Sequence, residues 1–382
     1  MMKAVILAGG QDVGKCPLSL VRPRPLFPML NGVLVQNLLR LLHRADVDEA
    51  IICANGKTHI LREHFTAEPE TIIGLGFHED KLPRGAAGCM RDVARLLKNG
   101  TFLVLEGSLF LDGGVAELID HHRRNGAALT VGAVPAANWQ AGNGNEPLLH
   151  RLAPVGVYVV EPGVLRHIPD RGYYDIKEQL IPALMKQETE ISVTRFTGRH
   201  RRITNASSYA SFMQEILSGA FGGEHFIGLN EAAPHVWIAG GADVHPSATI
   251  IGPAVICSNA TIGKHATIIG PSLVSDSVSL GDQTLVSGSI LWSGASVEPG
   301  ASVEQSIVTD SFCVREHGRL SCCVAVDRDL NLGEMRGLQQ GGYEVGLQRK
   351  SVLQSIADFY RSLTSPTVSQ ETPEPGKELL PV

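Results

Sequence analysis

The chain has 382 residues, enough for two domains, and 43% hydrophobic residues, enough for a buried core in each. Its 33 basic and 39 acidic residues give a net charge of −6, so neither a nucleic acid nor an anionic membrane is expected as a partner. Seven scattered cysteines without a C-x-x-C pair favour free thiols in the cytoplasm over disulfides or zinc. No stretch approaches the ~18 apolar residues of a membrane span.

The first patterned stretch runs from Lys3 to Met29. A short apolar run, Ala4 to Leu7, is followed by Gly9 and Gly10, as in a buried strand that ends in a tight turn. Open α/β sheets bind ligands just past such strand ends, where glycines let backbone N–H groups approach a phosphate or a base. The prolines that follow predict a long extended loop rather than a helix: Pro17, Pro23, Pro25 and Pro28.

A P-loop is one alternative for this stretch. Gly9, Gly14 and Lys15 have its spacing, but Cys16 lacks the hydroxyl that holds magnesium. A P-loop must also lead into a helix, which Pro17 opposes. The alternative is therefore weak.

The stretch resembles, without gaps, the fingerprint of the sugar-1-phosphate nucleotidyltransferases, roughly LAGGxGTRLxPLTxxxPKPLxPV. The matching segments are LAGG, PLS, PRPL and PM. The resemblance implies nucleotide binding at Leu7, Ala8, Gly9 and Gly10. Arg24 stands at the place of the family's lysine and is a candidate catalytic cation. Gly14 replaces the arginine that meets the triphosphate.

Strand-like and helix-like segments alternate through the next hundred residues. Helices are predicted at 33–44, 58–65 and 85–97, and strands at 50–54, 72–77, 102–108, 127–134 and 152–160. This order indicates an α/β domain with a mostly parallel, Rossmann-like sheet.

Two of these segments extend the resemblance. The turn that contains Gly85 and Gly88 is similar to the family's L-G-T-A-G segment, which implies contacts to base and ribose. The strand at 102–108 is similar to the family's central strand, whose final Asp is the main magnesium ligand. Ser108 occupies that position, and a neutral hydroxyl is a poor substitute. Glu106 lies on the same face of the strand and is the nearest carboxylate that could replace it.

The resemblance also implies a sugar site and a second metal position. Gly156 matches a sugar-contacting glycine, and either Asp175 or Glu178 matches a glutamate that binds sugar hydroxyls. The second metal-binding Asp aligns with Arg202. Since phosphoryl transfer depends on positioning and charge neutralisation, these replacements predict a site without a metal; Mg²⁺ is expected only if the protein is active.

The second half of the chain is a repeat. An aliphatic residue recurs at every sixth position from Val244 to Val286, and the pattern resumes at Leu291 after a one-residue deletion and continues to Val303. This hexapeptide repeat predicts a left-handed β-helix of a little over three coils. Three residues just outside the inward register are expected to be exposed apolar contacts of a homo-oligomer: Val255, Ile269 and Leu273.

The expected organisation is a nucleotidyltransferase-like α/β domain (1–225), a left-handed β-helix (235–325), a cap with a helix (326–363) and a disordered tail (364–382). The sequence favours a protein that binds nucleotide or nucleotide sugar with weak or lost turnover, as a sensor or as the partner of an intact paralogous enzyme. One alternative is an active nucleotidyltransferase that uses Glu106, Arg24 and Lys15. Another is a hexapeptide acyltransferase, although His245 and His265 occupy outward, turn-like positions.

Overall fold

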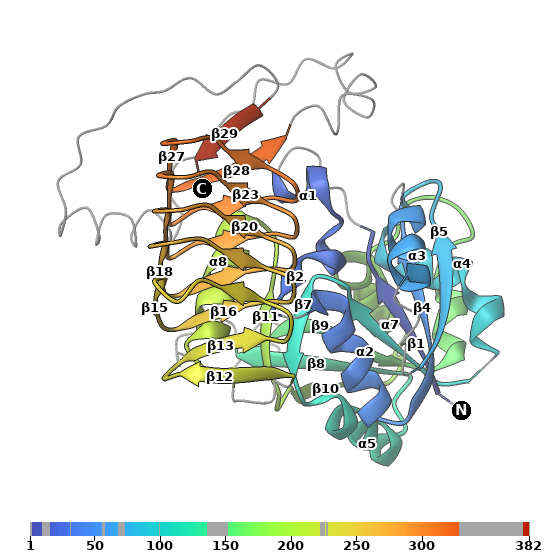
Figure 1. Cartoon of the computed structure of the whole chain (residues 1–382). Helices are drawn as coiled ribbons and strands as arrows, with labels where there is room; N and C mark the ends of the chain where they lie inside the picture. Colours follow the sequence, from blue (N-terminus) through green and yellow to red (C-terminus); the bar gives the residue numbers. More distant parts are fainter. Residues whose placement is uncertain are drawn as a thin grey trace, which may run out of the picture. The chain divides into compact units, whose positions relative to one another are not determined.

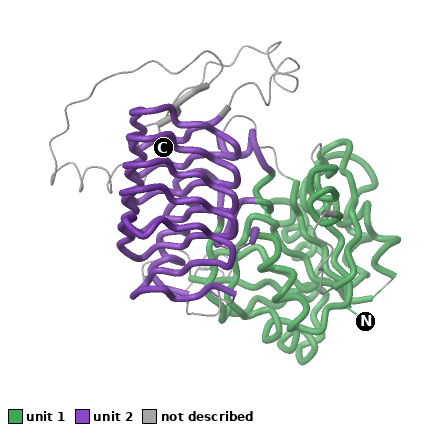
Figure 2. Tube along the Cα trace, viewed as in Figure 1, with its two compact units in different colours: residues 1–11, 23–26, 34–202 green, residues 12–22, 27–33, 203–382 purple. Residues whose placement is uncertain are grey.

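The computed structural model describes residues 2–9, 16–30, 32–55, 58–67, 73–98, 100–135, 152–221, 226, 228–327 and 377–381. Figures 1 and 2 show two compact units. Unit 1 comprises residues 1–11, 23–26 and 34–202, and unit 2 comprises residues 12–22, 27–33 and 203–382. The boundary expected near residue 225 therefore lies near 202, and two pieces of the proline-rich loop belong to unit 2.

Unit 1 is built on a seven-stranded sheet in the order β10-β8-β9-β6-β1-β4-β5. Only β9 runs antiparallel to its neighbours, so the predicted mostly parallel sheet is confirmed. Its strands are β1 (Met2–Leu7), β4 (Val47–Ala54), β5 (Gly74–Glu79), β6 (Phe102–Glu106), β8 (Leu129–Pro135), β9 (Leu152–Val160) and β10 (Ile191–Arg195).

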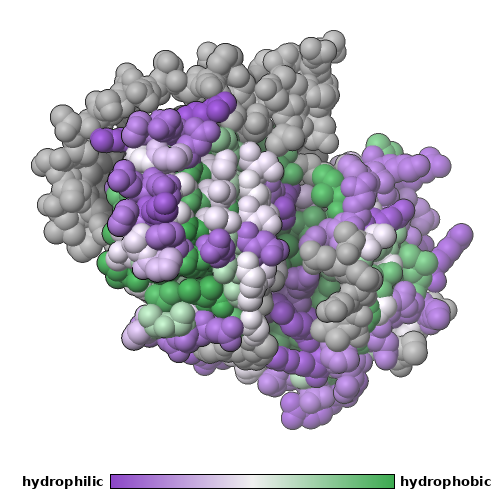
Figure 3. Space-filling view, viewed as in Figure 1, coloured by the Kyte–Doolittle hydropathy of each residue, from purple (hydrophilic) through white to green (hydrophobic). Residues whose placement is uncertain are grey.

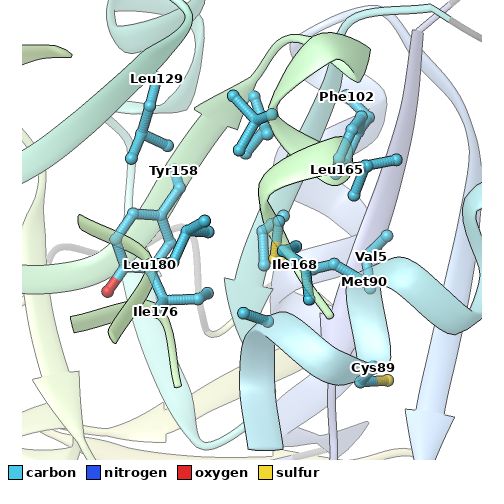
Figure 4. Close-up of a cluster of buried hydrophobic side chains, with 14 of the residues drawn as sticks. Val5, Cys89, Met90, Phe102, Leu129, Tyr158, Leu165, Ile168, Ile176 and Leu180 are labelled. Carbon is cyan, nitrogen blue, oxygen red and sulfur yellow. The ribbon is translucent and has the colours of Figure 1, made fainter. Parts of the chain in front are cut away.

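Helices pack on this sheet because their apolar faces repeat at helical spacing. The described helices of unit 1 are α2 (Leu34–Arg44), α3 (Thr58–Ala67), α4 (Gly85–Asp92), α5 (Val115–Asn125), α7 (Ile181–Lys186), three 3₁₀ helices, η1 (Arg24–Leu26), η2 (Ala94–Leu97) and η3 (Pro162–His167), and the π-helix η4 (Ile176–Leu180). One core cluster joins β1, β6, β8, β9, α4 and η4, including Val5, Phe102, Leu129, Tyr158 and Ile176 (Figure 4).

The proline-rich loop is not wholly extended as predicted. It contains the one-turn helix α1 (Leu18–Val21), which begins after Pro17, and η1, which includes Pro25. Proline is compatible with the first turn of a helix, where its missing N–H is not needed. A P-loop would lead into a long helix, and α1 is only four residues long.

A two-stranded ribbon adds to unit 1 beside the sheet. Strand β7 (Leu109–Asp112) pairs antiparallel with β11 (Arg199–Arg202), and this register places Arg202 opposite Leu109. Arg202 is thereby brought to the end of β6, next to the turn that contains Ser108.

Unit 2 is a three-sided solenoid of parallel strands, which confirms the β-helix. One sheet contains β14 (Asp243–Val244), β17 (Thr261–Ile262), β20 (Ser279–Leu280), β23 (Ser296–Val297) and β26 (Cys313–Val314); the second contains β15 (Thr249–Ile251), β18 (Thr267–Ile269), β21 (Leu285–Ser287), β24 (Ser302–Glu304) and β27 (Arg319–Ser321). The third contains β12 (Leu229–Ala233), β13 (Val236–Ala239), β16 (Ala254–Ile256), β19 (Ser272–Val274), β22 (Ile290–Leu291), β25 (Ile307–Val308), β28 (Cys323–Asp327) and β29 (Lys377–Pro381).

The solenoid is longer than the predicted three coils. Ile250 pairs with Ile268, 18 residues on, whereas Val286 pairs with Val303, 17 residues on. The same 17-residue step then leads to Leu320, so the one-residue deletion recurs in each later coil. A search for a strict six-residue period misses these coils because each contains one five-residue side.

The outer face of the third sheet is covered within unit 2. Helix α8 (Ala206–Leu217) packs against β19, and Phe27, Tyr209 and Trp292 form an aromatic cluster. Val255 and Leu273 are consequently fully buried, so the prediction that they are exposed contacts is wrong. The short ribbon of β2 (Pro28–Met29) and β3 (Gly32–Val33) also belongs to this unit.

An apolar patch does remain on the second sheet. Ile251 is 52% exposed and pairs with Ile269, which is half-buried. Figure 3 shows hydrophobic surface on the lower coils of the solenoid in this view.

The tail is not disordered throughout, as was predicted for 364–382. Residues 377–381 form β29, which pairs antiparallel with β28 and so covers the edge of the third sheet. An unpaired strand edge offers a row of N–H and C=O groups to any extended segment, which favours this pairing over disorder. The rest of the tail and most of the predicted cap, including its helix at 351–363, lie outside the described residues.

Candidate functional site

The first predicted nucleotide turn lies at the carboxyl end of β1. The amides of Ala8 and Gly9 donate to the carbonyl of Cys53 at 2.7 and 3.0 Å, which ties the turn to the end of β4. Gly9 is exposed, and Gly10 lies outside the described residues. The turn is at the sheet edge where ligands bind, but these two amides are already satisfied.

The second predicted nucleotide turn begins α4. Gly85 has φ +78°, and a Cβ there would lie 2.7 Å from the carbonyl oxygen of Tyr174, so the turn requires glycine. The amides of Ala87 and Gly88 both donate to that same oxygen at 3.1 Å. These two amides are therefore not free to donate to a ligand, contrary to the expectation from the sequence. A ligand at this turn would have to contact other atoms of the turn.

A compact ion cluster lies at the carboxyl end of β6. Arg202 Nη1 is 2.5 Å from Glu106 Oε2, and Lys177 Nζ is 3.2 Å from Glu106 Oε1. Arg202 Nη2 also donates to the carbonyl of Val155 at 3.0 Å. One carboxylate thus holds two cations from distant parts of the chain.

Gly156 forms the floor beneath this cluster. Its φ is +100°, and a Cβ there would lie 2.7 Å from Glu106 Cδ, so the Glu106 carboxyl group packs directly on the Gly156 backbone. Two residues further along β9, Tyr158 is buried and its hydroxyl has no hydrogen-bond partner among the described residues. Burial, followed by the nearby Glu106 carboxylate, raises the pKa of the Tyr158 hydroxyl far above its usual range.

The two candidate sugar carboxylates take other positions. Asp175 caps η4, where its Oδ1 accepts the amides of Lys177 and Glu178 at 2.7 and 3.1 Å. Glu178 is exposed. Lys177, between them, is the side chain that reaches Glu106. Sequence reasoning missed Lys177 because the resemblance directed attention to carboxylates.

The residues at the expected metal positions do not fit magnesium. Ser108 offers a neutral hydroxyl, Arg202 is a cation, and both oxygens of Glu106 are engaged by cations. Magnesium prefers carboxylate and phosphate oxygens in an octahedral arrangement. Among the described residues, no group of three or more His, Cys, Asp or Glu side chains is arranged to hold a metal.

The remaining candidates lie elsewhere. Arg24 is half-buried in η1, and Lys15 lies outside the described residues. In the solenoid, His245 Nδ1 accepts the amide of Ser247 at 3.1 Å, while His265 is exposed at a turn with φ +57°.

A depression of about 600 Å³ in unit 1 lies at the opposite edge of the sheet, where β8 and β10 begin. Glu161 contributes to its wall and accepts hydrogen bonds from Thr101 at 2.6 Å and from the buried His122 at 3.0 Å. Burial would raise the pKa of the Glu161 carboxyl group, but these two hydrogen bonds outweigh it and lower that pKa. The depression is separate from the ion cluster.

Part of this sequence is similar to a known protein family. A sequence model of the nucleotidyl transferase family matches residues 3–141, which include both glycine turns and Glu106. Over this segment the chain is similar to nucleotidyltransferases that act on sugar-1-phosphates.

Three nucleotidyltransferases are similar to the chain over most of their own length, at low identity. Mannose-1-phosphate guanylyltransferase of Mycobacterium tuberculosis is 22% identical over 79% of this chain and 83% of its own length. UTP–glucose-1-phosphate uridylyltransferase of Synechocystis is 23% identical over 83% of this chain and 89% of its own. The catalytic subunit beta of mannose-1-phosphate guanylyltransferase from Danio rerio is 25% identical over 94% and 99%.

None of the described helices is both long and apolar enough to cross a membrane.

Proposed function

We propose that this nucleotidyltransferase-family protein binds a nucleotide or nucleotide sugar at the carboxyl edge of the unit 1 sheet without magnesium. Its turnover of sugar-1-phosphate is weak or lost, and it acts in the cytoplasm as a sensor or as the partner of an intact paralogous enzyme. The observation that carries this proposal is Arg202, a cation at the position of a metal-binding carboxylate, paired with Glu106 at 2.5 Å.

The chemistry of the cluster supports binding better than transfer. A guanidinium presents a fixed fork of donors that suits phosphate oxygens, so Arg202 can attract the ligand's phosphates itself. Transfer needs further charge neutralisation and positioning, which the family's arginine and magnesium-binding aspartates would supply. Those positions are Gly14, Ser108 and Arg202 in this chain.

Arg202→Ala tests the binding role. We expect nucleotide binding to weaken by about 1.5–3 kcal/mol, the range for a hydrogen bond to a charged group. Calorimetric titration with nucleotides and nucleotide sugars, in magnesium and in EDTA, measures this change. Arg201→Ala is the matched control, because the exposed Arg201 is next on the same strand, points to the other face and bonds the carbonyl of His200. Equal losses in both variants would contradict the proposal.

An assay of pyrophosphate release decides between this proposal and an active enzyme. Wild-type protein should release little pyrophosphate with any sugar-1-phosphate and nucleoside triphosphate. Robust magnesium-dependent release would mean that Glu106, Arg24 and Lys15 compensate for the missing groups. The acyltransferase alternative gains no specific support from His245 or His265.

A further inference from the structure

The Glu106 cluster contains a second cation, Lys177, besides Arg202. Each oxygen of Glu106 is taken by a different cation: Oε2 by Arg202 and Oε1 by Lys177. The three side chains carry a net charge of +1. They are also accessible, since Glu106 is 22%, Arg202 35% and Lys177 36% exposed.

We infer that Glu106 is an internal competitor for the ligand's phosphates, and that Lys177 is the second phosphate-binding cation beside Arg202. This inference rests on the proposed function. In the free protein Glu106 bridges the two cations as a phosphate would; ligand binding replaces that bridge and releases the carboxylate.

Local structure holds all three partners in place. Arg202 is fixed by the pairing of β11 with β7 and by its bond to the Val155 carbonyl. Lys177 is presented by the first turn of η4, whose start is capped by Asp175. The Gly156 backbone limits the movement of Glu106 on one side, because the Glu106 carboxyl group packs against it. A Cβ added at Gly156 would lie 2.7 Å from the carboxyl carbon of Glu106.

The charges favour exchange for a doubly charged ligand. A carboxylate brings one negative charge to two cations, whereas a phosphate brings between about 1.5 and 2 and three strong acceptor oxygens. A diphosphate can therefore satisfy both cations better than Glu106 does, while a singly charged ligand gains little. Glu106 thus lowers the affinity for every ligand that must displace it, and a diphosphate overcomes this cost more easily than a singly charged ligand does.

The test is calorimetric titration of the full chain with inorganic pyrophosphate in EDTA. Glu106→Gln keeps the size of the side chain and removes its charge, so pyrophosphate should bind about tenfold more tightly. Glu63→Gln is the control, because it removes the charge of an exposed carboxylate on α3 in the same unit. It should leave the affinity unchanged.

Lys177→Gln tests the second cation, and a double variant tests the coupling. Alone, Lys177→Gln should weaken pyrophosphate binding about tenfold. In the Glu106→Gln background the loss should be larger, because Lys177 no longer has an internal partner to give up. A purely structural Lys177 would change the melting temperature and leave pyrophosphate affinity as it was.

The outcomes separate this inference from the proposed function. If wild-type protein binds pyrophosphate and Glu106→Gln binds it equally or less tightly, the inference is wrong and the proposed function stands. Equal tightening by Glu63→Gln would reduce the effect to overall charge and also overturn it. If wild-type protein binds neither pyrophosphate nor any nucleotide sugar, both fall.

Discussion

At Gly156, one added carbon should disturb both the backbone and the ion cluster. Its backbone has φ +100°, and the carboxyl group of Glu106 occupies the space that a side chain would need. Glycine at this position therefore supports both the backbone conformation of β9 and the geometry of the ion cluster.

Gly156→Ala should lower the free energy of unfolding by roughly 2–5 kcal/mol, the sum of backbone strain and overpacking. Gly113→Ala is a close control, because Gly113 has φ +99° and no atom within 4 Å of the added Cβ. Backbone strain alone should cost it about 1–2 kcal/mol. Urea denaturation of both variants measures the difference, and equal losses would show that Glu106 moves aside freely.

Single residues also decide the magnesium response. Ser108→Asp combined with Arg202→Asp restores both expected carboxylates, so nucleotide binding should become magnesium-dependent. Ser108→Asp alone should not do this while Arg202 remains. Full turnover should not return, because Gly14 still lacks the arginine. Titrations in magnesium and in EDTA check this, and a double variant indifferent to magnesium would argue that the metal positions have been misplaced.

At the scale of elements, one corner of the solenoid is stabilised by a ladder of buried side chains. Ser272 Oγ accepts the amide of Ser289 at 3.2 Å, Ser289 Oγ that of Ser306 at 3.1 Å, and Ser306 Oγ that of Cys323 at 3.2 Å. Each hydroxyl also donates to a backbone carbonyl. The ladder satisfies amides that the turn would otherwise bury without partners.

Ser289→Ala removes one rung and leaves the buried amide of Ser306 without its acceptor. We expect the free energy of unfolding to fall by about 1–3 kcal/mol. Ser287→Ala, on the neighbouring strand β21 with its side chain outside the inward register, should have a much smaller effect. Chemical denaturation followed by circular dichroism compares the two, and a neutral Ser289→Ala would mean that the ladder contributes little.

At the scale of the whole molecule, the predicted homo-oligomer now depends on a different surface. Val255 and Leu273 are buried within unit 2, whereas Ile251 and Ile269 form an exposed apolar patch on the described part of the solenoid that could support self-association. Ile251→Lys should therefore shift the protein towards monomer in light scattering. Ser279→Lys, exposed on another sheet, should not. A wild-type monomer at high micromolar concentration would end the oligomer prediction.

Local patterns predicted much of the fold, as two segments illustrate. The run at 152–160 matches β9, because a short segment rich in valine and other apolar residues favours a buried strand. The hexads predicted the solenoid but missed its later coils, since each of these contains a five-residue side. The prolines at 17–28 predicted an extended loop, but the loop contains α1 and η1. Proline is compatible with the first turn of a helix as well as with extended chain.

The sequence by itself determined the family resemblance, the parallel sheet, the repeat and the replacement of three charged residues of the fingerprint by Gly14, Ser108 and Arg202. These depend on spacing along the chain, which a periodic strand or a gapless fingerprint records directly. Only the tertiary structure decided that Lys177 rather than Asp175 or Glu178 reaches Glu106, and that α8 packs against β19, where Leu273 is buried. Contacts between residues far apart in the chain are set by strand register and helix packing, and those leave no local periodicity to read.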